Sequence, residues 1–231
     1  EYIQGKDLRH FIYEFNRKQT RIPVTTSLRI VYSVGLALAF AHQNQLTHRD
    51  VKPSNILLED SGRVVLTDFG LAKMIGQPLV KEGRLIEGTP AYIAPEQALG
   101  QPPEPLSDLY SLGVVFYELL TGEQPNTGID PLSTTLNQVV KDIPSPQESF
   151  PELPDEVAEV VIRATRRNVH ERYSSMKEFL ENLTKIRIKI KTAKLPTATL
   201  KDLKVSSDRV SSWAPPDLED AGRLVSLHFV D

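Results

Sequence analysis

The stretch at residues 108–121 constrains the fold of this chain more than any other. Read as an α-helix, it carries apolar side chains on almost every side; they are Leu109, Leu112, Val114, Val115, Phe116, Leu119 and Leu120. A helix with one apolar stripe lies on the surface of a domain, whereas a helix that is apolar all round must be enclosed. The sequence therefore predicts a helical domain with this helix at its centre.

Apolar residues recur at helical spacing in four other stretches. These stretches lie at residues 7–14, 25–44, 154–167 and 174–185. Two short β-like runs, at residues 56–58 and 64–66, flank Ser61 and Gly62, and this pattern predicts a hairpin. Residues 68–96 show no clear period, and so long a loop inside a compact domain usually serves function. We expect a mainly α fold with a small β element.

Composition excludes several classes of protein. Cysteine is absent, which rules out disulfides and thiolate metal sites and is compatible with a cytoplasmic location. There are 27 Lys and Arg against 30 Asp and Glu, so no charge excess favours nucleic acid. The best apolar run, residues 30–41, is shorter than the roughly 20 residues that a bilayer requires. We expect no nucleic-acid partner and no membrane contact, although the basic stretch at residues 185–194 leaves an anionic surface as an alternative.

Four short motifs follow one another along the chain. They are HRDVKPSN at residues 48–55, DFG at 68–70, GTPAYIAPE at 88–96 and DLYSLG at 108–113. Each alone is a weak signal, but in this order and at these separations they resemble the signature of protein kinases. The form GTPAYIAPEQ resembles that of bacterial serine/threonine kinases. The resemblance covers residues 1–185 and implies transfer of the ATP γ-phosphate to Ser or Thr hydroxyls of protein substrates, with Mg²⁺.

The resemblance gives five residues a chemical role. Phosphoryl transfer requires an aligned hydroxyl and a triphosphate clamped by cations. Asp50 would accept the hydrogen of the substrate hydroxyl, and Lys52 would place its ammonium near the transferring group. Asn55 and Asp68 would offer oxygen ligands to the metal. Thr89 would bond to Asp50 and Lys52, and it is typical of kinases that prefer Ser or Thr.

The first residues of the chain resemble the hinge that binds adenine in kinases. Backbone groups of Glu1 and Ile3 would meet the adenine ring, and Leu57 would form the floor of its pocket. Asp7 falls where many kinases carry an acidic ribose contact. An Asp directly before a helix is equally suited to cap it, so both roles stay open.

Other matching residues have structural roles in the resemblance. His48 and Phe69 would be packing residues that link the two lobes. Asp108 would accept hydrogen bonds from the backbone of the catalytic loop, and Glu96 would form a buried ion pair with Arg172. Loss of one partner from such a pair is costly because a bare charge remains buried.

A kinase also needs a Gly-rich loop, a strand Lys and a helix Glu in its small lobe. We recognise none of these before the hinge. We therefore expect a protein-kinase-like large (C-terminal) lobe at residues 1–185 with the small lobe absent, and we expect this polypeptide alone to be inactive. A Ser/Thr/Pro/Lys-rich linker would follow at residues 186–216, and residues 217–231 resemble the start of a truncated further domain.

A non-catalytic half-kinase that docks partners is the alternative function. The joint presence of Asp50, Lys52, Asn55 and Asp68 favours the enzyme, because a docking module has no chemical need for all four.

The activation segment has an unusual composition. Arg49 next to the catalytic Asp is typical of kinases in which a phosphate on this segment pairs with the Arg. Yet residues 71–88 contain no Ser, Thr or Tyr. Glu82 or Glu87 could supply a permanent negative charge instead. Our hypothesis is an activation segment without phosphorylation control, with Glu87 as the partner of Arg49, and a solvated Glu87 is the alternative.

Overall fold

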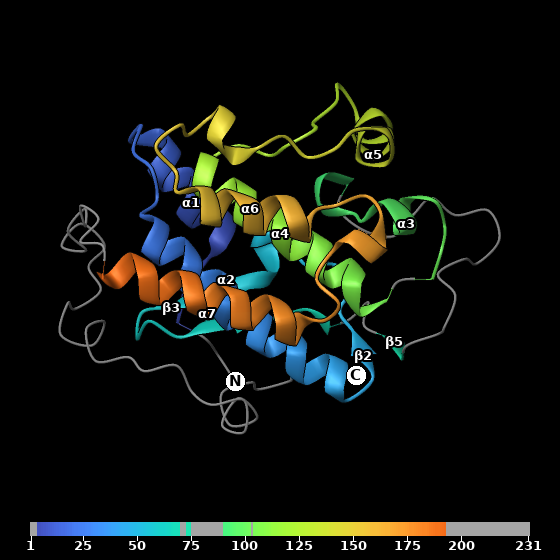
Figure 1. The fold of residues 1–231 in the computed structure, drawn as a ribbon, viewed down its shortest axis with the longest axis horizontal. Helices are drawn as coiled ribbons and strands as arrows, with labels where there is room; N and C mark the ends of the chain where they lie inside the picture. Colours follow the sequence, from blue (N-terminus) through green and yellow to red (C-terminus); the bar gives the residue numbers. More distant parts are fainter. Residues whose placement is uncertain (1–3, 70–72, 75–89, 103, 193–231) are drawn as a thin grey trace.

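The fold is mainly helical, as predicted (Figure 1). The computed structural model describes residues 4–69, 73–74, 90–102 and 104–192. Its helices are α1 (Leu8–Arg17), α2 (Val24–Gln43), α3 (Pro95–Ala98), α4 (Pro105–Thr121), α5 (Pro131–Val140), α6 (Asp155–Ala164) and α7 (Met176–Thr192). Short 3₁₀ turns lie at η1 (Pro53–Asn55), η3 (Pro90–Tyr92), η4 (Pro146–Glu148) and η5 (Val169–Glu171).

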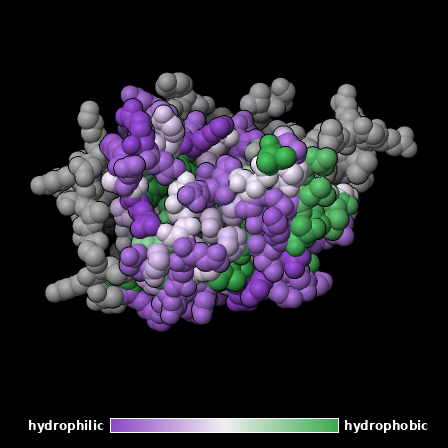
Figure 2. Space-filling model, turned by 90° about the horizontal axis from the view of Figure 1, so that it is seen from above, coloured by the Kyte–Doolittle hydropathy of each residue, from purple (hydrophilic) through white to green (hydrophobic). Residues whose placement is uncertain are grey.

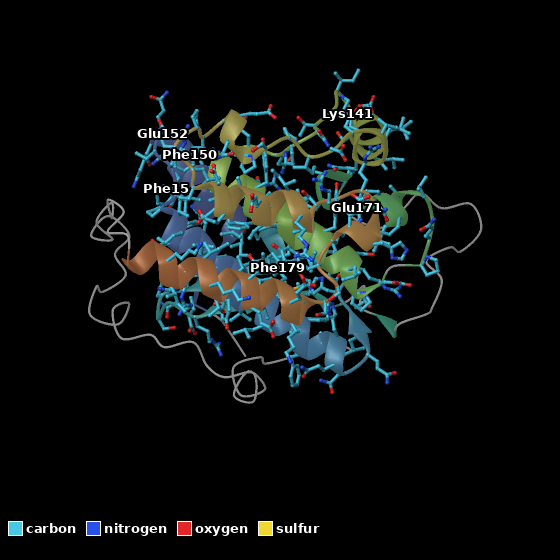
Figure 3. The ribbon with its side chains drawn as sticks, in the orientation of Figure 1. Phe15, Lys141, Phe150, Glu152, Glu171 and Phe179 are labelled. Carbon is cyan, nitrogen blue, oxygen red and sulfur yellow. The ribbon has the colours of Figure 1, made fainter. Side chains whose placement is uncertain are left out.

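Helix α4 lies at the centre of the core, which confirms the prediction made for residues 108–121. Every residue from Ser107 to Leu120 is buried. Helices α2, α6 and α7 pack around it, and α7 also crosses α2 (Figure 1). Gly113 permits the close approach of α6, because a Cβ atom there would lie 2.7 Å from the Thr165 methyl. In Figure 3, Phe179 of α7 lies in this packed layer, and it is fully buried.

A small antiparallel sheet, with the strand order β1-β3-β4, lies beside the helices. Its strands are β1 (Gly5–Asp7), β3 (Ile56–Glu59) and β4 (Val64–Leu66), and a second pair joins β2 (Leu46–Thr47) to β5 (Lys73–Met74). The predicted hairpin is confirmed, with Ile56 opposite Leu66. Gly62 turns the chain with φ of 91°, in the left-handed region that glycine tolerates best.

Helix α2 is, among the described residues, the one helix long and apolar enough to cross a membrane. Its span of twenty residues exceeds the run that we considered. However, 67% of its most apolar stretch is buried inside the fold. The apolar character of α2 is thus accounted for by packing in the core.

Helix α7 continues to Thr192, into the stretch that we interpreted as the start of a linker. Ile186 and Ile190 are buried, whereas Ile188 between them is 60% exposed. Two buried isoleucines spaced four residues apart keep one helix face in the core, and packing therefore extends the helix. The rest of the proposed linker, and the expected further domain at residues 217–231, lie outside the described residues.

Helix α5 lies outside the helical stretches that the sequence predicted. Its start nevertheless carries a local signal. The Asp130 carboxylate accepts a hydrogen bond of 2.7 Å from the backbone of Ser133, and Pro131 occupies the first helical position. Both residue types favour a helix N-terminus.

Candidate active site

The catalytic loop brings three of the predicted site residues into contact. Lys52 Nζ lies 2.5 Å from Asp50 Oδ2. Asn55 Nδ2 donates to the backbone carbonyl of Asp50 at 2.9 Å and to its Oδ2 at 3.2 Å. The 3₁₀ turn η1, which begins at Pro53, folds the chain back so that Asn55 reaches Asp50. The loop is therefore closed by its own functional side chains.

Asp68 follows the strand that returns beside this loop. The backbone N–H and the hydroxyl of Thr67 both donate to the carbonyl oxygen of Asn55, at 2.8 and 3.2 Å. The next residue, Asp68, has φ of 61° and an exposed side chain. The β3–β4 hairpin thus fixes the backbone of Asp68 close to that of Asn55.

The described residues contain no group of three His, Asp or Glu side chains that could hold a metal ion. An ion at this loop would have to use the Asn55 amide, the Asp68 carboxylate and oxygens from a substrate. Mg²⁺ is commonly bound in this way, through one or two carboxylates and substrate phosphates. Because Asn55 bonds to Asp50 through Nδ2, its amide oxygen Oδ1 is the atom that would meet such an ion.

Asp108 of α4 anchors the backbone just before Asp50, as predicted. Its carboxylate accepts hydrogen bonds of 2.8 Å from the N–H groups of His48 and Arg49. A third contact of 2.8 Å comes from His42 Nε2 on α2, which the sequence analysis did not identify. Asp108 is 1% exposed, so these donors replace the water that its charge would otherwise need.

His48 joins the catalytic loop to the segment that carries Asp68. Its ring lies edge-on to Phe69 with the centroids 4.5 Å apart, so the two residues predicted to be packing residues contact one another. The Asp50 N–H donates to His48 Nδ1 at 3.3 Å. We therefore assign the proton to Nε2, which lies 2.9 Å from the carbonyl of Thr67 and donates to it.

Asp7 and Leu57 are paired residues on adjacent strands. The Asp7 carboxylate accepts the N–H of His10 at 2.7 Å, so Asp7 is the N-cap of α1, one of the two roles left open. Leu57 is half-buried on β3. Glu1, Ile3 and Thr89 lie outside the described residues, as do Glu82 and Glu87.

Glu96 and Arg172 form the predicted ion pair across the domain. Two bonds of 2.8 and 2.7 Å join the guanidinium to both carboxylate oxygens, and Arg172 also donates to the carbonyls of Leu106 and Arg166. Burial alone would raise the pKa of Glu96, but the bonds and charge of Arg172 outweigh it and lower the pKa below its ordinary value. The pair ties the residues that follow the activation segment to the start of α4.

The sequence analysis did not identify Glu118, a buried carboxylate near the C-terminal end of α4. Tyr92 donates its hydroxyl to Glu118 at 2.7 Å, and Gln124 donates to the Tyr92 oxygen at 2.6 Å. Burial raises the pKa of Glu118, and these neutral donors offset the rise only in part. The available signal was a Glu among the mostly apolar residues 112–120, because such a charge is almost never buried without partners.

Comparison with known proteins identifies the family. The family model described as protein kinase domain matches residues 1–185. The chain belongs to the protein kinase family. Among curated proteins, this kinase chain is 37% identical over 81% of its length to the serine/threonine-protein kinase PknA of Mycobacterium tuberculosis. It is 33% identical over 77% of its length to the serine/threonine-protein kinase PrkC of Bacillus subtilis.

A probable serine/threonine-protein kinase of Clostridium perfringens is 33% identical over 81% of the kinase chain. The matched regions make up 42% of the length of PknA and 27% of that of PrkC and of the Clostridium protein. The relatives are therefore considerably longer than the region that the kinase chain shares with them.

The match corrects our expected fold class. We expected the large lobe alone, with the small lobe absent, but the protein kinase domain model matches from residue 1 through residue 185. The prediction of an absent small lobe is therefore wrong. It relied on our not recognising a Gly-rich loop and its partner residues, and an unrecognised motif is weak evidence of a missing lobe. The helical fold with a small sheet fits a kinase.

Proposed function

We propose that this domain transfers the γ-phosphate of ATP to Ser or Thr hydroxyls of protein substrates. One observation carries the proposal: Asp50, Lys52 and Asn55 are in mutual contact through Asp50, and Thr67 joins the backbone of Asn55 to the residue before Asp68. Phosphoryl transfer uses two carboxylates, an ammonium and an amide, and these two adjoining loops carry all four groups.

Asp50 is the group proposed to orient the substrate hydroxyl. As the hydroxyl oxygen bonds to the γ-phosphorus, the bond from that phosphorus to the bridging oxygen of ADP breaks, and the hydroxyl proton passes to the Asp50 carboxylate. Lys52 keeps its ammonium within 2.5 Å of that carboxylate, where it can also offset negative charge on the transferring group. The Asp108 contacts hold the preceding backbone in place during this step.

Asn55 and Asp68 are the proposed metal ligands, and ATP with Mg²⁺ is the cofactor that the family implies in general. Both residues offer hard oxygen atoms, as Mg²⁺ requires. When bound, the ion would neutralise part of the phosphate charge. The chain's own contribution is to fix the Asn55 amide through its two bonds to Asp50, so that its oxygen is held in one orientation.

The nucleotide contacts remain proposals. Leu57 is proposed to face the adenine ring, in line with its half-buried position on β3. Backbone groups of Glu1 and Ile3 are proposed to bond the ring, and Asp7 would have to share its carboxylate between the ribose and its cap on α1. Thr89 is proposed to bond Asp50 and Lys52. We also propose a cytoplasmic location, where ATP is available.

The expected inactivity of this polypeptide depended on an absent small lobe, so it is not part of the proposal. The test uses the full-length protein that carries this chain, labelled ATP, Mg²⁺ and a generic protein substrate, followed by phosphoamino-acid analysis. We expect label on Ser or Thr. Asp50→Asn should reduce turnover by about 10²-fold or more without changing ATP affinity. Ser54→Ala, in the same loop, is the matched control and should keep wild-type turnover.

Equal turnover in Asp50→Asn and wild type would overturn the assignment of Asp50. A wild-type protein that binds ATP but transfers no phosphate would overturn the proposed reaction and favour the docking module.

A further inference from the structure

Arg9, in the first turn of α1, is an exposed cation. The neighbouring Lys6 and His10 both lie close to Glu14, at 2.7 and 3.3 Å. In the part of the chain that the structure describes, the Arg9 side chain forms no hydrogen bond and no ion pair. Asp7 is two positions away, where helical residues do not face each other, and its carboxylate caps α1. Arg9 therefore carries a positive charge that no carboxylate of its own helix pairs with.

The direction in which Arg9 points follows from the contacts of α1. Asn16, seven residues further along the helix, donates its side-chain amide to the carbonyl of Gly122 at 2.7 Å. Seven residues make close to two turns of an α-helix, so Arg9 and Asn16 share one face. Gly122 is the C-cap of α4. The face of α1 that carries Arg9 is therefore turned toward the C-terminal end of α4, where Glu118 lies.

The charge of Arg9 reaches the hydrogen-bonded pair of Tyr92 and Glu118. Burial raises the pKa of both groups, and the positive charge of Arg9 acts against the rise at each. Glu118 is 8% exposed and accepts the Tyr92 hydroxyl, whereas Arg9 is exposed. The guanidinium thus lies on the solvent side of this pair, beside the turn at residues 90–92 that follows the activation segment.

The surroundings of Arg9 adjoin the catalytic loop. Helix α1 packs against η1, the turn that follows Asp50 along the loop, and residues 53–55 of this turn are uncharged. From the other side, Gln97 Nε2 donates to the carbonyl of Arg49 at 3.5 Å, which ties the segment after residues 90–92 to the residue before Asp50. The catalytic loop therefore lies between α1 and this segment, and Arg9 faces the segment from α1.

The surface on the α1 side of the molecule is polar. Figure 2 shows mainly hydrophilic surface on the side where α1 lies in Figure 1, and apolar surface where α5 lies. An extended peptide advances about 3.3 Å per residue, so a peptide that presents a hydroxyl to Asp50 would reach α1 within a few residues. On such a surface, complementary charge rather than apolar contact selects one peptide over another.

We propose that Arg9 is a specificity-determining residue that favours substrates with an Asp or Glu a few positions from the phosphorylated Ser or Thr. The inference rests on the phosphotransfer proposed above and names the charge of its preferred substrates. A substrate carboxylate near the guanidinium gains a charge pair, whereas a substrate Lys or Arg at the same place is repelled. Because Arg9 is exposed, the effect on affinity is about threefold to fivefold, and salt reduces it.

Phosphorylation of peptides by the full-length protein tests the proposal. A library with a fixed Thr and varied flanking residues should show acidic residues enriched at one or two positions. Matched peptides with Glu, Gln or Lys at such a position then give ratios of kcat/KM. For wild type the Glu peptide should exceed the Lys peptide by about threefold or more, mainly through KM. Arg9→Gln should bring the ratio close to one, and Arg9→Glu should invert it.

Arg17→Glu, in the last turn of the same helix, makes the same change of charge and is the matched control. It should keep the wild-type ratio. Raising the ionic strength from about 0.05 to 0.5 M should lower the wild-type ratio toward one, because salt screens exposed charges. A wild type that prefers the Lys peptide, or an acidic preference that persists unchanged in Arg9→Glu, would overturn the proposal.

Binding measurements separate this inference from the proposed reaction. Fluorescently labelled Glu and Lys peptides are titrated against Asp50→Asn, and against Asp50→Asn combined with Arg9→Glu. Tighter binding of the Glu peptide to the first protein and of the Lys peptide to the second supports the role of Arg9, even where wild type transfers no phosphate and the reaction itself is refuted. Equal affinities of both peptides for both proteins would refute the role of Arg9 and leave the reaction untouched.

Discussion

Two carboxylates near opposite ends of α4, the half-buried Glu96 of α3 and the buried Glu118 of α4 itself, have opposite pKa shifts. Burial acts on both in the same direction and raises the pKa. At the first end Glu96 meets the Arg172 guanidinium, and its pKa falls below the ordinary value. At the second end Glu118 accepts hydrogen bonds from neutral donors and feels the charge of Arg9 only weakly, so burial prevails and its pKa stays above the ordinary value. The charge of the partner, more than the depth of burial, decides the protonation of a buried acid.

Residues 90–96, which follow the activation segment, are fixed to the domain by two different kinds of contact. Glu96 is fixed by a charge pair that keeps its strength at neutral pH. The hydroxyl of Tyr92 donates a hydrogen bond to Glu118, whose ionisation is disfavoured by burial. The Ser111 hydroxyl donates to the backbone carbonyl of Tyr92 at 2.7 Å. The Glu96–Arg172 pair should therefore contribute more to the free energy of unfolding than the Tyr92–Glu118 bond. The contribution of Glu118 should decrease as pH rises.

Of the substitutions at these two sites, removal of Arg172 should lower the free energy of unfolding most. Arg172→Met leaves the Glu96 charge buried with no cation and should lower the free energy of unfolding by about 3–5 kcal/mol. Urea unfolding of the full chain measures it. Lys189→Met is the control, because its pair with Glu156 is exposed and its loss should leave the free energy of unfolding nearly unchanged. Equal losses in the two variants would contradict the account.

Removing the Tyr92 hydroxyl should have a smaller effect. Tyr92→Phe keeps the ring in the core but takes the direct donor away from Glu118, and it should cost about 1–3 kcal/mol in unfolding free energy. Urea unfolding again gives the value. Tyr13→Phe on the exposed face of α1 should be neutral. A Tyr92→Phe variant as stable as wild type would show that the hydroxyl does not support the buried acid.

The smallest effect is a difference in pH dependence between the two ends. The folded pKa of Glu118 is raised, so its contribution to stability is full below its unfolded value of 4.5 and is lost as pH rises through the folded pKa. Glu118→Gln removes this loss, so the variant should gain stability relative to wild type as pH rises from about 4 to 8.

The folded pKa of Glu96 is lowered, so its contribution is present above 4.5 and is lost as pH falls through the folded pKa. Glu96→Gln should therefore lose stability relative to wild type over the same rise in pH. Unfolding curves at several pH values check both signs. Two variants that trend in the same direction would contradict the comparison.

The sequence was informative where function depends on short, ordered motifs. The contacts of Asp50 with Lys52 and Asn55 arise within one short loop, and the turn at Ser61 and Gly62 signals the hairpin that returns toward Asp68. The Asp108 and Glu96–Arg172 contacts are distant in sequence, and only the resemblance to kinases predicted them.

The features that were missed depend on tertiary packing. The contacts of His42 with Asp108 and of Glu118 with Tyr92 form only when α2 and η3 pack against α4. No local sequence pattern predicts that packing. Helix α5 buries its polar side chains and exposes its apolar ones, so its apolar positions do not indicate the face that packs on the core. Its cap at Asp130 and Pro131 was a local signal that could have found it. The extension of α7 follows from the burial of Ile186 and Ile190.

The most direct test of the proposed reaction locates the metal. Crystals of the full-length protein with Mn²⁺ and a non-hydrolysable ATP analogue would give an anomalous peak for the ion. The account predicts that peak at about 2.0–2.3 Å from Asn55 Oδ1 and from an Asp68 oxygen, with the γ-phosphate facing Asp50. An ion bound elsewhere, or an Asp68 side chain turned away from the site that holds Asn55, would contradict it.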